Sequence, residues 1–189
     1  MSEGMYGLVG VIIGVMAGWL VPFFDRGRKR KRDAQYLAIR VVCILDRYVV
    51  DCADACNERL EMDDYGTTHV ASPAPKLASY PEDVDWSCIE HTLMYAILSL
   101  PRDVELASDY LFGYLEHSAG SIDEYAAERA TKYGGLGLQA AAICDKLRGS
   151  YSIPTLEHEN WDPVQYMKDE RKRREKEKTE RAKPDVNLG

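Results

Sequence analysis

The chain has 189 residues, enough for one compact domain with additional segments at its ends. Its formal charge of -7 is distributed in blocks, with a basic segment at residues 26–32, an acidic body over residues 33–167 and a basic stretch over residues 168–183. Because phosphate binding needs a cationic surface, the acidic body argues against nucleic acid as a partner of the domain.

The first predicted element is a membrane-spanning helix. Residues 5–24 contain no charged side chain and, as a helix, would extend over roughly 30 Å, the thickness of a bilayer's hydrocarbon core. A cleaved signal peptide would have basic residues before the apolar run, whereas this chain has Glu3 there. A buried helix of a small domain would not need such a long uncharged run. Residues 1–25 are therefore predicted to form a transmembrane anchor.

A basic segment follows this anchor directly. Basic residues beside a span stay on the cytoplasmic side, which predicts a single-pass membrane protein with its N-terminus outside and its domain in the cytoplasm. The same side chains are expected to contact anionic headgroups of the lipid bilayer, at about 1 kcal/mol each close to the surface. This basic collar, residues 26–32, consists of Arg26, Arg28, Lys29, Arg30, Lys31 and Arg32.

Glycines recur through the predicted span at steps that place them on one side of a helix. Small residues there let two helix backbones approach closely, so this face predicts self-association into a homo-oligomer. The alternative is that glycine is simply frequent in membrane helices. The predicted oligomerisation face consists of Gly7, Gly10, Gly14 and Gly18.

Residues 33–154 are predicted to form an acidic helical domain. Apolar residues recur at three- and four-residue steps over residues 33–60, which predicts a helix continuing from the collar. Residues 65–84 contain three prolines and few large apolar side chains, so they are predicted to form a loop that is either disordered or a contact surface.

Three further helices are predicted after this loop. Asp85 can cap a helix that Pro101 stops, and another helix follows from about Arg102. Ser121 and Glu124 have capping-box spacing and open the last one, which ends near Gly149 and Pro154. Since no segment shows a convincing strand alternation, the predicted fold class is all-α, a transmembrane helix followed by a four-helix bundle.

Residues 155–189 are predicted to form a charged helix or tail. Asp162 followed by Pro163 is a typical helix start, but no apolar stripe continues after Met167. A solvated, frayed helix or a disordered segment is the simplest interpretation. The alternative is a basic arm that docks on the acidic body, on a partner protein or on anionic lipid.

Two patterns in the sequence could form chemical sites. The cysteine pair Cys52 and Cys56 and the pair Cys88 and His91 each have helical spacing, and thiolate with imidazole would suit zinc or a nucleophilic thiol. Cysteine is commonly a small buried core residue, so no metal and no cofactor is expected. The glycines of residues 134–137 lack the context of a phosphate loop and favour close helix packing or a local kink.

Two sequence stretches resemble a family of small uncharacterised bacterial membrane-anchored proteins. The first is residues 40–54, Arg-Val-Val-Cys-Ile-Leu-Asp-Arg-Tyr-Val-Val-Asp-Cys-Ala-Asp. The second is residues 81–101, which begins with Pro-Glu-Asp-Val-Asp-Trp and ends with Leu-Met-Tyr-Ala-Ile-Leu-Ser-Leu-Pro. The resemblance implies a bacterial inner-membrane setting and no particular activity.

Together these features predict a membrane-tethered interaction or scaffold protein. It would self-associate through its span and present its domain to an unidentified cytosolic or membrane protein. The alternative is a small thiol- or metal-dependent enzyme using Cys52, Cys56, Cys88 and His91.

Overall fold

A computed structural model describes residues 3–57, 60–62, 68–117, 121–156 and 161–181, and for residues 3–26 only the course of the backbone. The chain is predominantly helical, which confirms the all-α prediction. The described elements, in chain order, are α1 (Glu3–Ala55), β1 (Leu60–Met62), β2 (Thr68–Val70), the 3-10 helix η1 (Trp86–Cys88), α2 (His91–His117), α3 (Ile122–Tyr151) and α4 (Pro163–Arg181).

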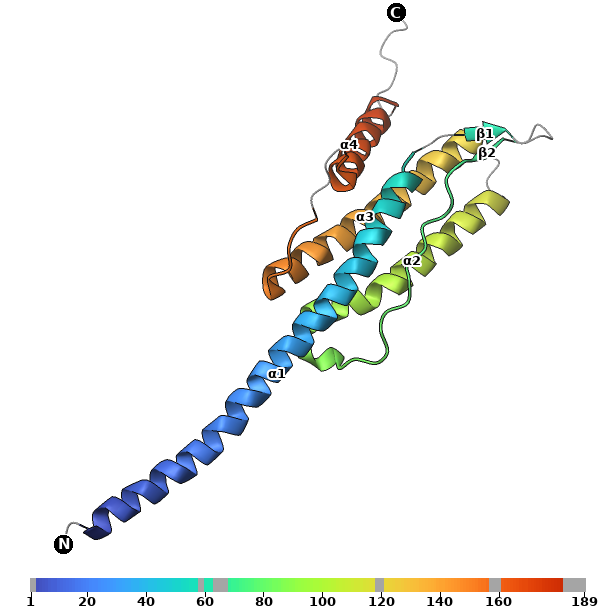
Figure 1. The fold of residues 1–189 in the computed structure, drawn as a ribbon. Coiled ribbons are helices and arrows are strands. Elements are labelled where there is room, and N and C mark those ends of the chain that lie inside the picture. The colour runs from blue at the N-terminus through green and yellow to red at the C-terminus, as the bar shows by residue number, and fades with distance from the viewer. Residues whose placement is uncertain (1–2, 58–59, 63–67, 118–120, 157–160, 182–189) are drawn as a thin grey trace, which may run out of the picture.

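Helix α3 is the centre of the bundle, because α1, α2 and α4 all pack against it. The C-terminal half of α1 lies along α3, while its N-terminal half leaves the bundle as the same unbroken helix (Figure 1). The core forms where Leu45 and Tyr48 of α1 meet Ile97 of α2 and Leu147 of α3, each of them fully buried. Burying a large apolar side chain stabilises the fold by about 1.5–3 kcal/mol, so this seam holds the helices together.

The continuous helix from the collar into the domain is confirmed, although it ends at Ala55 and not near residue 60. The residues beyond it form a short antiparallel hairpin, in which Leu60 pairs with Val70 and Met62 with Thr68. Three-residue strands are too short to show an alternating pattern, so the sequence did not indicate them.

The predicted break at Pro101 is wrong, because α2 runs through that residue. Proline removes one backbone hydrogen bond and usually ends a helix. Here Pro101 is exposed, while Leu100 before it and Leu111 beyond it are buried against the core. Tertiary packing on both sides of the proline therefore keeps one helix where two were expected.

The start of α2 also differs from the prediction. Asp85 caps the short helix η1, its Oδ1 accepting a hydrogen bond from Ser87 N at 2.9 Å. Helix α2 begins at His91, and Glu90 serves as its cap, with its two carboxylate oxygens accepting from Thr92 N and Leu93 N at 2.9 Å each. The Thr92 hydroxyl, which also donates to Glu90 Oε1, and these two amide bonds hold the pKa of Glu90 below its usual value.

Residues 71–85, here called the strap, have no regular secondary structure yet pack along the bundle from the hairpin to η1 (Figure 1). Pro75 and Pro81 are buried, and Leu77 and Tyr80 pack against the core. Part of the predicted loop is therefore a contact surface within the molecule itself, while residues 65–67 of it lie outside the described residues.

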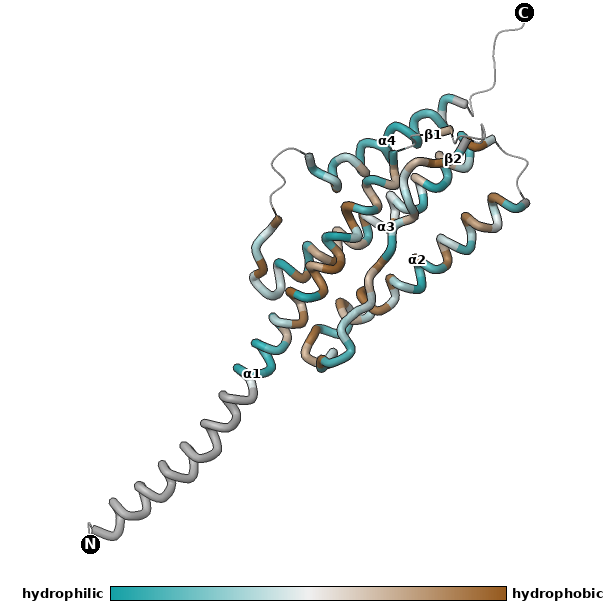
Figure 2. The backbone as a smooth tube through the Cα atoms, turned by 45° about the vertical axis from the view of Figure 1, so that its right-hand side comes forward, coloured by the Kyte–Doolittle hydropathy of each residue, from teal (hydrophilic) through white to brown (hydrophobic). Residues whose placement is uncertain are grey.

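Helix α4 packs on α3 and α1 although most of its residues are hydrophilic (Figure 2). Asp162 caps it as expected, its Oδ1 accepting from Val164 N at 2.9 Å and from Gln165 N at 3.1 Å. Pro163 and Met167 are fully buried. The described part of the charged tail is thus a docked helix, and residues 157–160 and 182–189 lie outside the description.

Candidate functional site

The basic collar lies where α1 leaves the bundle. Its side chains from Arg28 to Arg32 are all exposed, and those of Arg26 and of the span lie outside the described residues. Among the described collar residues, Arg30 contacts the folded domain, with its Nη2 donating to the carbonyl oxygen of Ser87 at 2.8 Å. The first buried residue of α1 is Ala34, so the collar directly adjoins the folded domain.

Within the part of the chain whose side chains are described, no helix has the length and apolar character needed to cross a membrane. The predicted span and its glycines Gly7, Gly10, Gly14 and Gly18 lie outside that part. Their backbone belongs to α1, so all four glycines stand on a regular helix.

The structure does not bring the four candidate thiol and imidazole residues together. Cys88 and His91 lie beside Gly27 and Ala34 of α1, around a shallow hollow at the collar end of the bundle. Cys52 is 18 residues further along α1 than Ala34, which at 1.5 Å per residue is roughly 27 Å away. Among the described residues, no group of His, Cys, Asp or Glu side chains has a metal-binding arrangement.

Cys52 and Cys56 lie instead at the closest contact between α1, α3 and α4. A Cβ atom placed on Gly137 would lie 2.7 Å from Cys52 Cβ and 2.5 Å from Met167 Sδ, and one on Gly134 would lie 3.0 Å from Cys56 Sγ. Close helix packing, one of the two interpretations of residues 134–137, is therefore correct. The two glycines let the thiol-bearing face of α1 and Met167 of α4 fit against α3.

The thiols of this seam are poorly suited to react. Burial raises the pKa of Cys52 well above its usual value, and the thiol of Cys56 donates to Ala130 O at 3.5 Å. Burial and the nearby Asp46 raise the pKa of Cys144 to about 12. Because the thiolate is the nucleophile, the raised pKa values keep Cys52 and Cys144 in their unreactive form at neutral pH, and burial shields the thiol of Cys56.

We expect Cys52, Cys56 and Cys144 to react with a thiol reagent at pH 8 about a hundredfold more slowly in the folded chain than in urea, since reaction requires opening of the core. Mass spectrometry of alkylated peptides at timed intervals measures each rate. Equal rates in the folded and unfolded chain would contradict the packing described here.

Arg129 of α3 is a buried cation that ties the strap to the helices. Its Nη1 donates to Ala55 O at 3.2 Å and to Ser72 Oγ at 3.1 Å. Its Nη2 donates to Ser72 O at 2.8 Å and to Pro73 O at 2.7 Å. The guanidinium thus binds the end of α1 and the beginning of the strap at once, and it also lies over the ring of Tyr133 at 5.3 Å.

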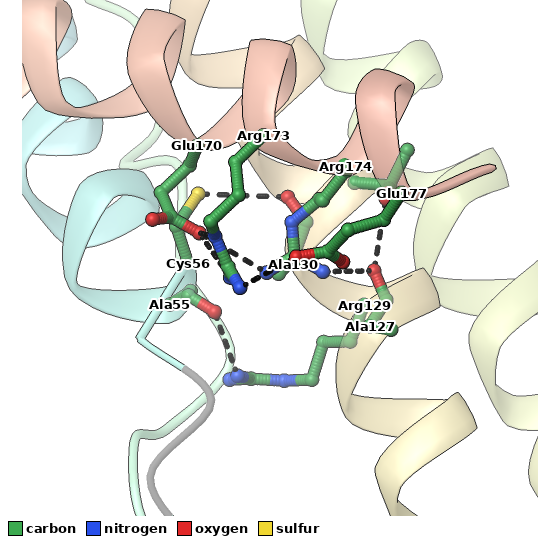
Figure 3. Close-up of polar contacts among 10 residues, drawn as sticks. Ala55, Cys56, Ala127, Arg129, Ala130, Glu170, Arg173, Arg174 and Glu177 are labelled. Atoms are coloured by element: carbon green, nitrogen blue, oxygen red, sulfur yellow. Dashed lines mark hydrogen bonds and ion pairs between the residues drawn. The ribbon is translucent and has the colours of Figure 1, made fainter. Parts of the chain in front are cut away.

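Helix α4 is held by a second arginine (Figure 3). Arg174, only 9% exposed, donates from Nη1 to Ala127 O of α3 at 3.1 Å, and its Nη2 lies 3.5 Å from Glu170 Oε2. Arg173 also pairs with Glu170, at 2.7 Å. The charges of α4 therefore do more than keep the helix hydrated, because one of them reaches a backbone carbonyl of the bundle.

A third polar contact joins α1 to α3. Arg148 Nη2 lies 2.6 Å from Asp46 Oδ2, and both side chains are largely buried beside a cavity of about 280 Å³. Arg148 Nε also donates to Pro154 O at 3.2 Å. The pair joins α1 to α3, and through Pro154 it also holds the chain just beyond the end of α3.

Sequence reasoning missed Arg129 and Arg174 as structural residues. Both look like ordinary helix-surface cations in the sequence, because their partners are backbone carbonyls of distant segments. For Arg129 the sequence did contain an indication of burial, because this residue lies on the same helix face as Ala126, Ala130 and Tyr133, which are buried.

Comparison with known protein families, with curated proteins and with solved structures finds no match for this chain. The resemblance of residues 40–54 and 81–101 to a bacterial membrane-anchored family therefore remains a prediction from those residues alone.

Proposed function

We propose that this chain is a membrane-tethered interaction protein. Residues 1–25 anchor it as a single-pass inner-membrane protein with its N-terminus outside, and the helical domain lies in the cytoplasm. The anchor associates with a second copy through Gly7, Gly10, Gly14 and Gly18, and the domain presents a surface to another cytosolic or membrane protein.

One observation carries this proposal. Helix α1 continues without a break from the domain into the uncharged segment, and that segment extends away from the bundle, so the other helices do not cover it (Figure 1). Twenty consecutive uncharged residues, most of them apolar, on a helix whose backbone leaves the bundle need another apolar environment. A bilayer supplies one, and the length of the segment suits it.

The exposed collar supports the orientation. Arg28, Lys29, Lys31 and Arg32 are exposed just before the first core residue of α1, where they can lie at the headgroup level. A domain that begins within a few residues of this collar would be held close to the membrane surface.

An exposed apolar face on α2 supports the interaction role. Tyr95, Leu98, Leu106 and Phe112 are between 47% and 75% exposed, although α2 buries its other side on α3. Apolar side chains gathered on one exposed face are typical of contact surfaces. This face is the part of the domain that we assign to the unidentified partner.

The orientation is testable with one surface thiol. In a chain with Cys43→Ser, Cys88→Ser and Met62→Cys, a membrane-impermeant maleimide should label the thiol only after the cells are opened. Position 62 is suitable because the native side chain is 71% exposed and lies outside the face assigned to the partner. Labelling in intact cells would place the domain outside and overturn the orientation.

Self-association should depend on the glycine face. Gly14→Leu would keep two helix backbones apart, and we expect it to weaken the dimer in detergent or bilayers by about tenfold, roughly 1.4 kcal/mol. Energy transfer between labelled chains measures the dimer fraction. Val9→Leu, on the side of the helix opposite Gly14 and Gly18, is the matched control, and equal loss in both variants would contradict a specific face.

The partner can be sought by crosslinking pull-down from membranes. The full chain should recover a protein that a chain with Leu98→Glu and Phe112→Glu on the exposed face of α2 does not. If both chains recover the same set, or neither recovers a specific protein, the interaction role loses its support.

A further inference from the structure

Helix α1 has one face that no other described element covers. Its core face packs on α3 and α4, while the opposite side exposes Tyr36 at 59%, Ile39 at 42% and Cys43. The spacing of three and then four residues places these side chains on one stripe of the helix. We call residues 36, 39 and 43 the open stripe.

The open stripe is in helical register with the glycines of the anchor. Helix α1 is unbroken from Glu3 to Ala55, and an α-helix has 3.6 residues per turn. Gly18 and Tyr36 are therefore about five whole turns apart, and Gly7 and Cys43 about ten. The two members of each pair therefore stand on the same side of helix α1, although one belongs to the anchor and the other to the domain.

We propose that the open stripe extends the self-association face into the domain, and that it is covered by the same stripe of a second copy of this chain. The proposal rests on the association of the anchors proposed above. Two parallel α1 helices that meet along their glycines would bring residues 36, 39 and 43 of both copies to a shared two-fold contact, because the register is continuous. The interface would then run through the membrane, past the collar and along the bundle.

The charges beside the stripe permit this contact, whereas Lys29 and Arg32 of the collar, on the same side of α1, reach outward to the anionic headgroups. Arg40 lies 3.0 Å from Asp83, and Arg47 lies 3.0 Å from Asp51, each within its own chain. The two arginines that flank the stripe are thus neutralised before a second copy approaches. A symmetric contact therefore brings together an aromatic ring, a branched aliphatic side chain and a thiol, flanked by satisfied ion pairs.

Cys43 gives the contact a direct readout. On a two-fold axis the two Cys43 thiols face each other, so copper phenanthroline should oxidise the pair to an intermolecular disulfide in the full chain with Cys88→Ser, in bilayers. Most of the protein should then run as a dimer on a non-reducing gel. The matched control carries Cys43→Ser with Tyr95→Cys on α2, an exposed position off the stripe, and should remain mainly monomeric.

The stripe itself is tested by Ile39→Glu, with Met62→Glu on β1 as the control substitution. Burying a carboxylate in the contact should lower the Cys43-linked fraction about tenfold, whereas the control substitution should leave it unchanged. Circular dichroism confirms that both variants are folded, since positions 39 and 62 are exposed in the single chain.

Light scattering in detergent separates the two proposals. A dimer that forms through the anchor while Cys43 fails to crosslink would overturn the stripe and leave the self-association of the anchors standing. A monomer under all conditions would overturn both. Equal crosslinking of Cys43 and of the thiol at position 95 would show collisional contact and would also overturn the stripe.

Discussion

Replacing Arg129 with methionine is expected to lower the free energy of unfolding by about 3 kcal/mol. The substitution keeps much of the apolar stem and removes the guanidinium, leaving the carbonyl oxygens of Ala55, Ser72 and Pro73 without their donor. Unsatisfied polar groups in a buried position lose their full hydration. Urea unfolding followed by circular dichroism measures the change, with the protein in detergent.

Two comparisons make this prediction specific. Arg47→Met removes an exposed ion pair with Asp51 and should cost under about 1 kcal/mol. Trypsin should cleave after Lys76 in the strap faster in the Arg129→Met chain than in the original, because Arg129 holds the beginning of the strap. Equal cleavage rates would show that the strap is held by its apolar contacts alone.

Replacing Gly137 with alanine is expected to lower the free energy of unfolding by about 2 kcal/mol, the net of overpacking and a helix-propensity gain near 1 kcal/mol. The new methyl group would collide with Cys52 Cβ at 2.7 Å, an atom tied directly to the α1 backbone, and with Met167 Sδ at 2.5 Å. The flexible methionine can move, whereas α1 cannot without disturbing the core.

Gly135→Ala is the matched control, because a Cβ atom at that position would meet nothing within 4 Å. It should raise the free energy of unfolding by up to about 1 kcal/mol, since alanine favours the helix. Each variant adds one methyl group, and the two positions are only two residues apart on the same helix. If they shift the urea midpoint in the same direction, the contact between α1, α3 and α4 is not as tight as described.

The helices could be predicted where local chemistry and packing agree. Ser121 caps α3 through Glu124 N as its spacing indicates, and Asp162 caps α4. The core side of α1 follows the apolar spacing from Leu37 to Val49. At Pro101 the local preference and the packing disagree, and packing prevails.

The docking of α4 could not be read from the sequence. One buried methionine, fitting over Gly137, and one arginine reaching the carbonyl of Ala127 hold a helix that has no apolar stripe. Such partners are distant in the chain, and neither residue is unusual in its local context. The spacing within each pair also could not reveal that Cys52 and Cys56 lie far along α1 from the hollow that holds Cys88 and His91.

Flotation of membranes tests the central claim, that residues 1–25 anchor the domain in a bilayer. The full chain and a version lacking residues 1–32 are each expressed, and the membranes are washed with carbonate before being floated through a sucrose gradient. The first core residue is Ala34, so the shorter chain retains the buried contacts of the domain. The full chain should float and resist extraction, and the shorter chain should stay at the bottom. A full chain that is released by carbonate would contradict the anchor.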